Sequence, residues 1–178
     1  MGAGKSTVGS ALAQRLNWIF EDLDDRIIRR ERRPIADIFR ESGETAFRRA
    51  EHQALLEVVD ELRSGSARVV ALGGGAFVQK HNADLLRGAR VPTVFLDAPA
   101  EELWRRCCEQ ATQRGTERPL LNDRKQFREL YRSRLKAYRG ASVRLPTKGR
   151  AVDEIAAEVE QTLGLTRLSI RTEQGEVE

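Results

Sequence analysis

Apolar residues recur at helical spacing along several stretches of the chain, and short apolar runs separate these stretches. Val8, Leu12 and Leu16 lie four residues apart, so they share one face of a helix predicted over residues 4–16. Further helices are predicted over residues 27–31, 35–40, 43–62, 80–87, 124–139 and 152–163, and one more is predicted to begin at Pro99. Short runs rich in apolar residues predict strands at residues 18–22, 68–72, 92–96 and 142–145.

This alternation predicts an α/β fold in three α/β/α layers, because parallel strands need helices on both faces of their sheet. Periodicity vanishes between residues 109 and 124, which predicts a mobile surface loop. Residues 166–178 show neither helical period nor core content, so a frayed tail is expected there. No repeat or linker divides the chain, and we expect one domain over residues 1–165.

Length and cysteine content limit the class of protein further. A chain of 178 residues with 40% hydrophobic content suits one globular domain. It has neither an apolar run near the roughly 20 residues of a membrane span nor the apolar region of a signal peptide. Cys107 and Cys108 are adjacent, so they form neither a disulfide framework nor a zinc site and are expected to be packing residues. These features predict a cytoplasmic protein.

Positive charge is concentrated in residues 101–150, which hold 14 Lys and Arg against 6 Asp and Glu. An anionic ligand is expected near this segment. A solvated helix face or a nucleic-acid surface would show the same charge, although aromatic residues interleaved to stack on bases are absent there.

The clearest chemical motif is Gly2-Ala3-Gly4-Lys5-Ser6-Thr7, which matches the second half of the phosphate-binding loop G-x-x-x-x-G-K-[ST]. In such a loop, backbone N–H groups at a helix N-terminus hold the phosphates. Lys5 is expected to reach the β- and γ-phosphates, and the Ser6 hydroxyl is expected to bind the Mg²⁺ that bridges them. A flexible glycine-rich segment is the alternative for this motif alone.

A complete phosphate-binding loop also has a strand and a first glycine ahead of the residues that correspond to Gly2–Thr7. A loop that holds phosphate is anchored by a strand at one end and a helix at the other, and residues 1–178 encode only the helix. We therefore expect residues 1–178 alone to be poorly soluble or nearly inactive. An upstream strand and turn of roughly 8–12 residues is expected to restore solubility and activity.

Two carboxylates, Asp22 and Asp24, close the first predicted strand. Ligands of open α/β sheets bind at the carboxyl ends of strands, so one carboxylate is expected to serve a metal ion and the other a substrate hydroxyl. Leu23 lies between them on the predicted strand, and its side chain is expected to point away from theirs. A solvated acidic turn, or a pair of carboxylates at a helix N-terminus, would show the same pattern.

Several further motifs follow in a defined order: Gly-Glu-x-x-Phe-Arg-x-x-Glu over residues 43–51, Gly-Gly-Gly over 73–75, Arg-Pro-Leu-Leu over 118–121, and Arg134 four residues before Tyr138. With the phosphate loop and the two aspartates, they make residues 1–165 resemble shikimate kinase. The resemblance implies a P-loop NTPase fold with a substrate lobe near residues 23–51 and a mobile lid near 109–123. It also implies transfer of the γ-phosphoryl group of ATP to the 3-hydroxyl of shikimate, in chorismate and aromatic amino acid biosynthesis.

The resemblance further implies roles for individual residues. Asp24 is expected to orient, and to deprotonate, the attacking hydroxyl, Asp22 is expected to join Ser6 at the metal, and Arg118 is expected to swing with the lid over the transferring phosphoryl group. With Lys5, Asp24 and Arg118 are the expected catalytic residues. The residues expected to bind shikimate are Asp24, Arg48, Gly73, Gly74, Gly75 and Arg134. The residues expected to bind ATP are Gly2, Ala3, Gly4, Lys5, Ser6, Thr7, Arg106 and Arg118.

Two other functions stay open on the sequence alone. Another P-loop small-molecule kinase, such as a gluconate kinase, would share the phosphate loop, and a non-catalytic nucleotide-binding module would bind nucleotide without transferring phosphate. We expect a monomer whose partner is a small molecule rather than nucleic acid or a membrane. His52 and His81 are expected to be surface residues with no partner cluster.

Overall fold

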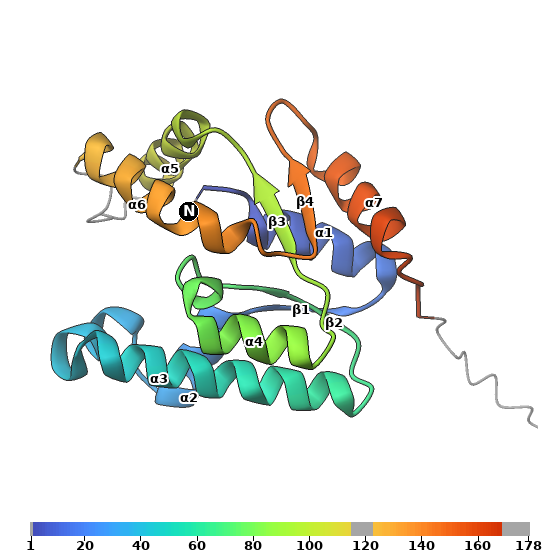
Figure 1. Ribbon diagram of the computed structural model, residues 1–178, viewed down its shortest axis with the longest axis horizontal. Helices are drawn as coiled ribbons and strands as arrows, with labels where there is room; N and C mark the ends of the chain where they lie inside the picture. Colours follow the sequence, from blue (N-terminus) through green and yellow to red (C-terminus); the bar gives the residue numbers. More distant parts are fainter. Residues whose placement is uncertain (1, 115–122, 169–178) are drawn as a thin grey trace, which may run out of the picture.

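The computed structural model of the protein describes residues 2–114 and 123–168. Helices and strands alternate along most of the chain, as predicted (Figure 1). In chain order the elements are α1 (Lys5–Leu16), β1 (Ile19–Asp22), α2 (Leu23–Glu31), α3 (Ile35–Arg63), β2 (Arg68–Ala71), the 3₁₀ turn η1 (Ala76–Val78), α4 (Lys80–Gly88), β3 (Val94–Asp97), α5 (Ala100–Arg114), α6 (Arg124–Tyr138), β4 (Val143–Pro146) and α7 (Val152–Leu163).

The four strands form two parallel pairs. β1 lies beside β2, with Ile19 opposite Arg68, and β3 lies beside β4, with Val94 opposite Val143. Within residues 2–114 and 123–168, no hydrogen-bonded ladder joins β2 to β3. The predicted three-layer α/β/α class is confirmed, with its described strands in two pairs.

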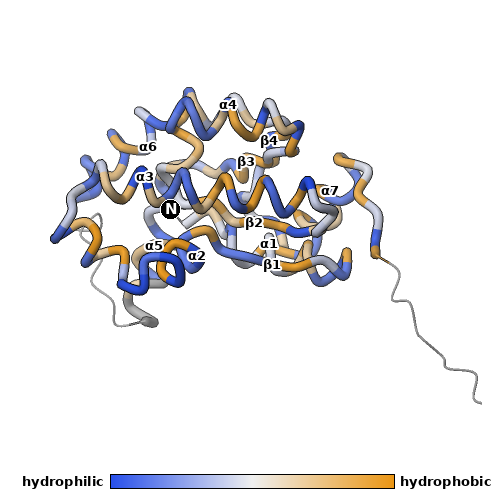
Figure 2. Tube along the Cα trace, turned by 90° about the horizontal axis from the view of Figure 1, so that it is seen from below, coloured by the Kyte–Doolittle hydropathy of each residue, from blue (hydrophilic) through white to orange (hydrophobic). Residues whose placement is uncertain are grey.

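Each pair of strands is associated with its own apolar core. Buried side chains of α2, α3 and α4 form one core, in which Leu23 and Ile27 are fully buried. Apolar positions recur along α3 and α4 between polar ones in Figure 2, which is the pattern of helices packed on one face. The second core lies among α1, β3, β4 and α7, and includes Leu96 and Leu145.

Helix α1 contacts both halves of the molecule. Its buried residues Val8, Leu12 and Leu16 belong to the core that contains β3 and β4, and Val69 of β2 packs against the same cluster. A third, smaller cluster joins α5 to α6, where Cys107 is buried, as predicted for a packing residue. Among the described residues, no helix combines the length and apolar character that crossing a membrane requires.

Helix α3 is interrupted at Gly43, where the predicted break between two helices is confirmed. Gly43 has φ 76° and ψ 174°, which lie outside the helical region. A positive φ strains residues that carry a Cβ, so glycine suits this position. The break divides α3 into a short first part and a long second part that contains Phe47 and Glu51.

Two expectations are wrong. The strand predicted over residues 18–22 does end at Asp22, but Asp24 lies in α2 and not on the strand face expected for it, because the Asp22 carboxylate caps that helix by accepting from the backbone N–H of Asp24. The loop predicted from residue 109 begins later, since α5 continues to Arg114. Strong helix formers and the ion pair between Arg105 and Glu109 sustain this last part of α5 without apolar periodicity.

Candidate active site

The phosphate loop leads into the N-terminus of α1. Gly2 and Gly4 have φ 63° and φ 79°, and Gly4 is the N-cap of the helix without a side-chain cap. A Cβ on Gly2 would lie 2.5 Å from the carbonyl oxygen of Leu103, so only glycine fits between this loop and α5. The first N–H groups of α1 are therefore suited to an anion, as the motif predicts.

Ser6 and Asp22 meet directly beside this helix N-terminus. The Ser6 hydroxyl donates to Oδ2 of Asp22 at 2.8 Å, and Oδ1 of Asp22 accepts from the N–H of Asp24 at 3.1 Å. A hydroxyl and a carboxylate are hard oxygen donors of the kind that Mg²⁺ prefers, and this ion usually takes few protein ligands beside phosphate and water. The described residues include no cluster of three His, Cys, Asp or Glu side chains that could enclose a metal. Ser6 and Asp22 therefore fit Mg²⁺ held mainly by phosphate and water.

Asp24 lies in the first turn of α2, where its environment favours the protonated form. Burial raises its pKa above the usual range, and the negative charge of Asp22 adds to this effect, while Lys5 and Arg48 oppose it. A carboxylate with a raised pKa accepts a proton more readily than an exposed one. Gly73 approaches this carboxylate closely, since a Cβ there would lie 2.8 Å from Oδ1 of Asp24.

Arg48 is held in α3 by two glutamates of the same helix. Its Nη1 donates to Oε2 of Glu51 at 2.9 Å, and its Nη2 donates to Oε1 of Glu44 at 3.1 Å. The Glu51 side chain is only 1% exposed, and burial raises its pKa while Arg48 lowers it. A Cβ on Gly75 would lie 2.5 Å from Nη1 of Arg48, so the glycine loop passes directly over the guanidinium.

Helix α6 reaches the same glycine loop from the other half of the molecule. The Tyr138 hydroxyl donates to the carbonyl oxygen of Gly74 at 2.5 Å, and burial raises the pKa of Tyr138 while the charge of Arg134 opposes this rise. Arg134 also lies near enough to lower the pKa of Glu51 by its charge. Two guanidinium groups, those of Arg48 and Arg134, therefore lie around one buried carboxylate.

The structure brings most of the predicted site residues into one region: Lys5, Ser6, Asp22, Asp24, Arg48, Gly73, Gly74, Gly75 and Arg134. Arg106 lies on α5, the helix that packs against Gly2, and it donates to Oε1 of Glu102 at 2.8 Å and to the carbonyl oxygen of Thr147 at 3.3 Å. Arg118 lies outside the described residues. Its predicted role stays a prediction.

Two partnerships at the site were not predicted from the sequence. Glu51 is the fixed partner of Arg48, and its only signal was its position one helical turn after Arg48 in the motif. The second partnership corrects the expectation of isolated histidines, because Nδ1 of His52 lies 2.7 Å from Oδ1 of Asn82. The fully buried Asn82 in turn donates to the carbonyl oxygen of Ala76, which directly follows the glycine loop. The ring of His81 packs edge-on against that of His52.

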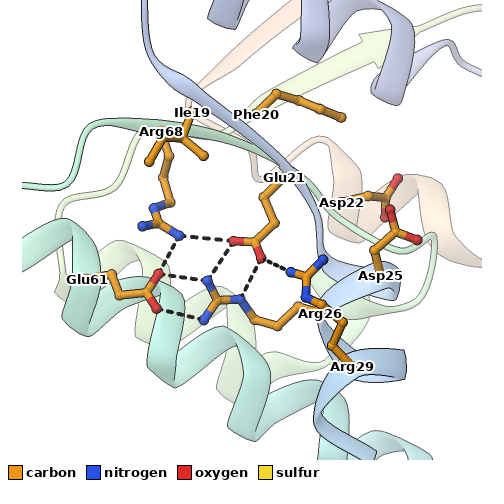
Figure 3. A pocket seen from close by; sticks show the side chains of 9 residues that line it. All are labelled: Ile19, Phe20, Glu21, Asp22, Asp25, Arg26, Arg29, Glu61 and Arg68. Atoms are coloured by element: carbon orange, nitrogen blue, oxygen red, sulfur yellow. Dashed lines mark hydrogen bonds and ion pairs between the residues drawn. The ribbon is translucent and has the colours of Figure 1, made fainter. Parts of the chain in front are cut away.

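On the opposite side of β1, Glu21 lies at the centre of an ionic cluster. Figure 3 shows Arg26, Arg29 and Arg68 converging on Glu21, whereas Asp22 points the other way, as successive residues of a strand do. Burial opposes ionisation of Glu21, but the hydrogen bond and charge of Arg26, with the charges of Arg68 and Arg29, hold its pKa below the usual value. The cluster fixes β1 against α2 and β2, and so supports Asp22 from behind.

A helix N-terminus suited to an anion, a hydroxyl and carboxylate suited to Mg²⁺, and the neighbouring Asp24 and Arg48 are the arrangement expected of a phosphotransferase with a P-loop NTPase fold. Comparison with known proteins narrows this class. The family model for shikimate kinase matches residues 1–164, and the chain belongs to the shikimate kinase family.

Relatives and solved structures agree with this assignment. The chain is 36% identical over 160 residues to the shikimate kinase of Persephonella marina, covering 89% of this chain and 92% of the relative. It is 40% identical over 166 residues to a shikimate kinase of Thermus thermophilus, covering 92% and 85%. Its fold matches the Acinetobacter baumannii shikimate kinase in complex with shikimate with a TM-score of 0.79 at 34% identity, covering 92% and 88% of the two chains. The Aquifex aeolicus shikimate kinase matches with a TM-score of 0.78 at 30% identity, covering 92% of each chain.

Proposed function

We propose that the protein transfers the γ-phosphoryl group of ATP to the 3-hydroxyl of shikimate, giving shikimate 3-phosphate and ADP. The observation that carries this proposal is the position of Asp24. Lys5 of the phosphate loop is near enough to lower its pKa, and Gly73 of the glycine loop, which also passes over Arg48, approaches its carboxylate. ATP bound at the phosphate loop and shikimate bound at Arg48 would thus both lie next to the Asp24 carboxylate. The family supports shikimate as the acceptor over gluconate or a purely nucleotide-binding role.

The phosphate loop is the proposed site of ATP. The backbone N–H groups at the start of α1 and the Lys5 ammonium would hold the β- and γ-phosphates, where the helix dipole and the lysine both favour negative charge. Mg²⁺ at Ser6 and Asp22 would neutralise charge on the phosphates as the γ-phosphoryl group leaves. Catalysis by these residues consists mainly of positioning and charge stabilisation.

Asp24 is the proposed group that orients the attacking hydroxyl and accepts its proton. Its raised pKa suits that task, because a partly buried carboxylate is a stronger base than a solvated one. Arg48 and Arg134 are proposed to bind the substrate carboxylate, since planar guanidinium groups match a carboxylate with two hydrogen bonds. Gly73, Gly74 and Gly75 would let the backbone approach the substrate closely.

The same proposal includes roles for two more arginines, a cellular location and an oligomeric state. Arg118 would close over the phosphoryl group with a lid near residues 109–123, and Arg106 on α5 would lie over the adenine. We place the activity in the cytoplasm, where ATP is present and the thiols of Cys107 and Cys108, which form no disulfide, stay reduced. The protein is proposed to act as a monomer.

An assay that couples ADP formation to a spectroscopic signal tests the function, with shikimate and gluconate compared as acceptors in the presence of ATP and Mg²⁺. Asp24→Asn keeps the shape of the side chain and removes its charge, so kcat should fall by at least about a hundredfold, as expected for loss of a general base, with little change in the affinity for ATP. Asp25→Asn, at the exposed neighbouring position, is the matched control and should retain activity. ADP formation that requires gluconate, or that survives Asp24→Asn, would contradict the proposal.

A further inference from the structure

The hydroxyl of Tyr138 joins two parts of the chain that are far apart in sequence. Tyr138 is the last residue of α6, which packs against α5 in the half that contains β3 and β4 (Figure 1), and it donates to the carbonyl oxygen of Gly74 at 2.5 Å. Gly74 is the middle residue of the glycine loop that follows β2. The hydrogen bond therefore connects α6 to the loop that approaches Asp24 and Arg48.

The ring of Tyr138 is held in place, so that its hydroxyl stays at this position. Its centroid lies 5.4 Å from that of Phe95 in β3, with 34° between the ring planes, and the side chain is partly buried. Burial raises the pKa of the Tyr138 hydroxyl, so this group keeps its proton, and its capacity to donate, at neutral and moderately alkaline pH. Tyr138 therefore presents a hydrogen-bond donor at a fixed position.

The neighbouring carbonyl groups of the glycine loop are held from within their own half. The carbonyl oxygens of Gly73 and Gly75 accept from backbone N–H groups of η1, each at 3.1 Å. That of Ala76 accepts from Nδ2 of Asn82 at 3.0 Å. Gly74 differs, because its carbonyl oxygen accepts from α6. Three consecutive glycines have no side chains to restrict φ and ψ, so the loop depends on such contacts to adopt one conformation.

A fixed carbonyl also fixes the direction of the next amide. In a trans peptide the carbonyl oxygen and the following N–H point in opposite directions, and the described residues contain no cis peptide bond. The Gly74 carbonyl points to α6, so the Gly75 N–H points away from that helix. Gly75 is also the residue at which the loop passes closely over the Arg48 guanidinium. The orientation of this peptide therefore determines how the loop lies over Arg48.

Helix α6 carries a second residue of the site on the same face. Arg134 lies one helical turn before Tyr138. Burial raises the pKa of Glu51, and the charges of Arg48 and Arg134 oppose this rise, so both arginines lie near this carboxylate. A contact that holds the end of α6 to the glycine loop therefore also limits how far Arg134 can move from Arg48.

We propose that Tyr138 is a positioning residue for the acceptor substrate. Its hydroxyl sets the peptide that follows Gly74, and it holds α6 where Arg134 and Arg48 can bind one carboxylate. Tyr138 acts through these groups and does not touch the substrate itself. The inference rests on the proposed function, in which that carboxylate belongs to shikimate.

The variant Tyr138→Phe removes the hydroxyl and keeps the ring that packs on Phe95, so it tests the hydrogen bond alone. Tyr131→Phe is the matched control. Tyr131 lies two turns earlier on the same helix, is also partly buried, and donates to Oδ1 of Asp97 and to the carbonyl oxygen of Ala98, each at 3.2 Å. Thermal unfolding measures the general loss of stability, which should be similar in the two variants.

Kinase assays in which each substrate is varied in turn measure the effect on binding. In Tyr138→Phe the KM for shikimate should rise about fivefold, as expected for the loss of one hydrogen bond, while the KM for ATP and kcat change by less than about twofold. In Tyr131→Phe both KM values should stay unchanged. An unchanged KM for shikimate in Tyr138→Phe, an equal rise in both KM values, or the same rise in Tyr131→Phe would overturn the proposal.

Nuclear magnetic resonance of the protein without substrates gives a readout that does not depend on catalysis. The carbonyl carbon signal of Gly74 and the amide signal of Gly75 should shift in Tyr138→Phe and stay in place in Tyr131→Phe. Unmoved signals in Tyr138→Phe would also overturn the proposal. If the wild type does not phosphorylate shikimate, the proposed function fails on its own, and these signals still decide whether Tyr138 positions the loop.

Discussion

Replacing Arg48 by methionine would leave the Glu51 carboxylate buried without its principal partner. Glu51 is 1% exposed and Arg48 is 20% exposed, so the pair lies largely out of solvent. Removal of one member of a buried ion pair typically costs about 3–5 kcal/mol. Because Arg134 also acts on Glu51, we expect the lower end of this range, about 3 kcal/mol. For a protein of this size that loss lowers Tm by about 6–12 °C.

The loss should depend on pH with a defined sign. Burial raises the pKa of Glu51 in the folded protein, and Arg48 works against this rise, so Arg48→Met raises that pKa further. An acid whose pKa is higher in the folded than in the unfolded state favours folding when protonated, and this advantage is lost as pH rises through the folded pKa. The Tm difference between wild type and variant should therefore be largest at neutral and alkaline pH and should narrow below about pH 5.

Thermal unfolding followed by circular dichroism across this pH range measures the effect, and the coupled kinase assay measures its functional part. The control is the double variant Arg48→Met/Glu51→Gln. Its neutral glutamine can be buried without the arginine, which the charged Glu51 carboxylate cannot. The double variant should recover most of the lost Tm while the KM for shikimate stays at least about tenfold raised, as expected for lost hydrogen bonds to a charged group. A Tm change that is small and the same at every pH would refute the reasoning about the buried pair.

Three further variants test separate contacts. Glu21→Gln should lower stability by about 1–3 kcal/mol at pH 7 in urea unfolding. Because folding lowers the pKa of Glu21, its ionised form contributes stability above about pH 4.5 and loses it on acidification, so the deficit should shrink as pH falls. Asn82→Leu removes the donor to the carbonyl oxygen of Ala76 and should raise the KM for shikimate severalfold without changing that for ATP; equal effects on both would point to general unfolding. Gly75→Ala places a methyl group 2.5 Å from the Arg48 guanidinium and should raise the same KM by at least about tenfold, and unchanged kinetics would show that this approach is not needed.

The order of helices and strands was predictable because most apolar positions follow one period within each element. Local hydrogen bonding decided the exceptions. The Asp22 carboxylate ends β1 by capping α2, so Asp24 reaches the site from a helix and not from a strand. A period of apolar residues carries no information about such a cap, although Asp is a common N-cap residue.

Those site residues that belong to short sequence motifs were predictable from the sequence. Ser6, Asp22 and Arg48 were identified because each belongs to a motif with fixed spacing. The structure places Ser6 against Asp22, and Arg48 near enough to Asp24 to act on its pKa. The contact between His52 and Asn82 was not predictable, since these residues lie 30 positions apart and meet only where α3 packs beside α4. Arg118 stays a prediction from the family motif.

Helix α1 packs against both halves of the molecule, and it begins directly after the Gly2–Gly4 segment. Its buried face packs with β3, β4 and α7, and Val69 of β2 contacts the same cluster. A nucleotide bound at the N-terminus of α1, as proposed above, would require these elements to be already assembled. By mass action the ligand then adds its own binding free energy to the cohesion of the two halves, about 2.7 kcal/mol at a hundredfold excess over Kd. If ATP binds there as proposed, the donor substrate would also stabilise the packing of the two halves, and the fold would be most stable when ATP is abundant.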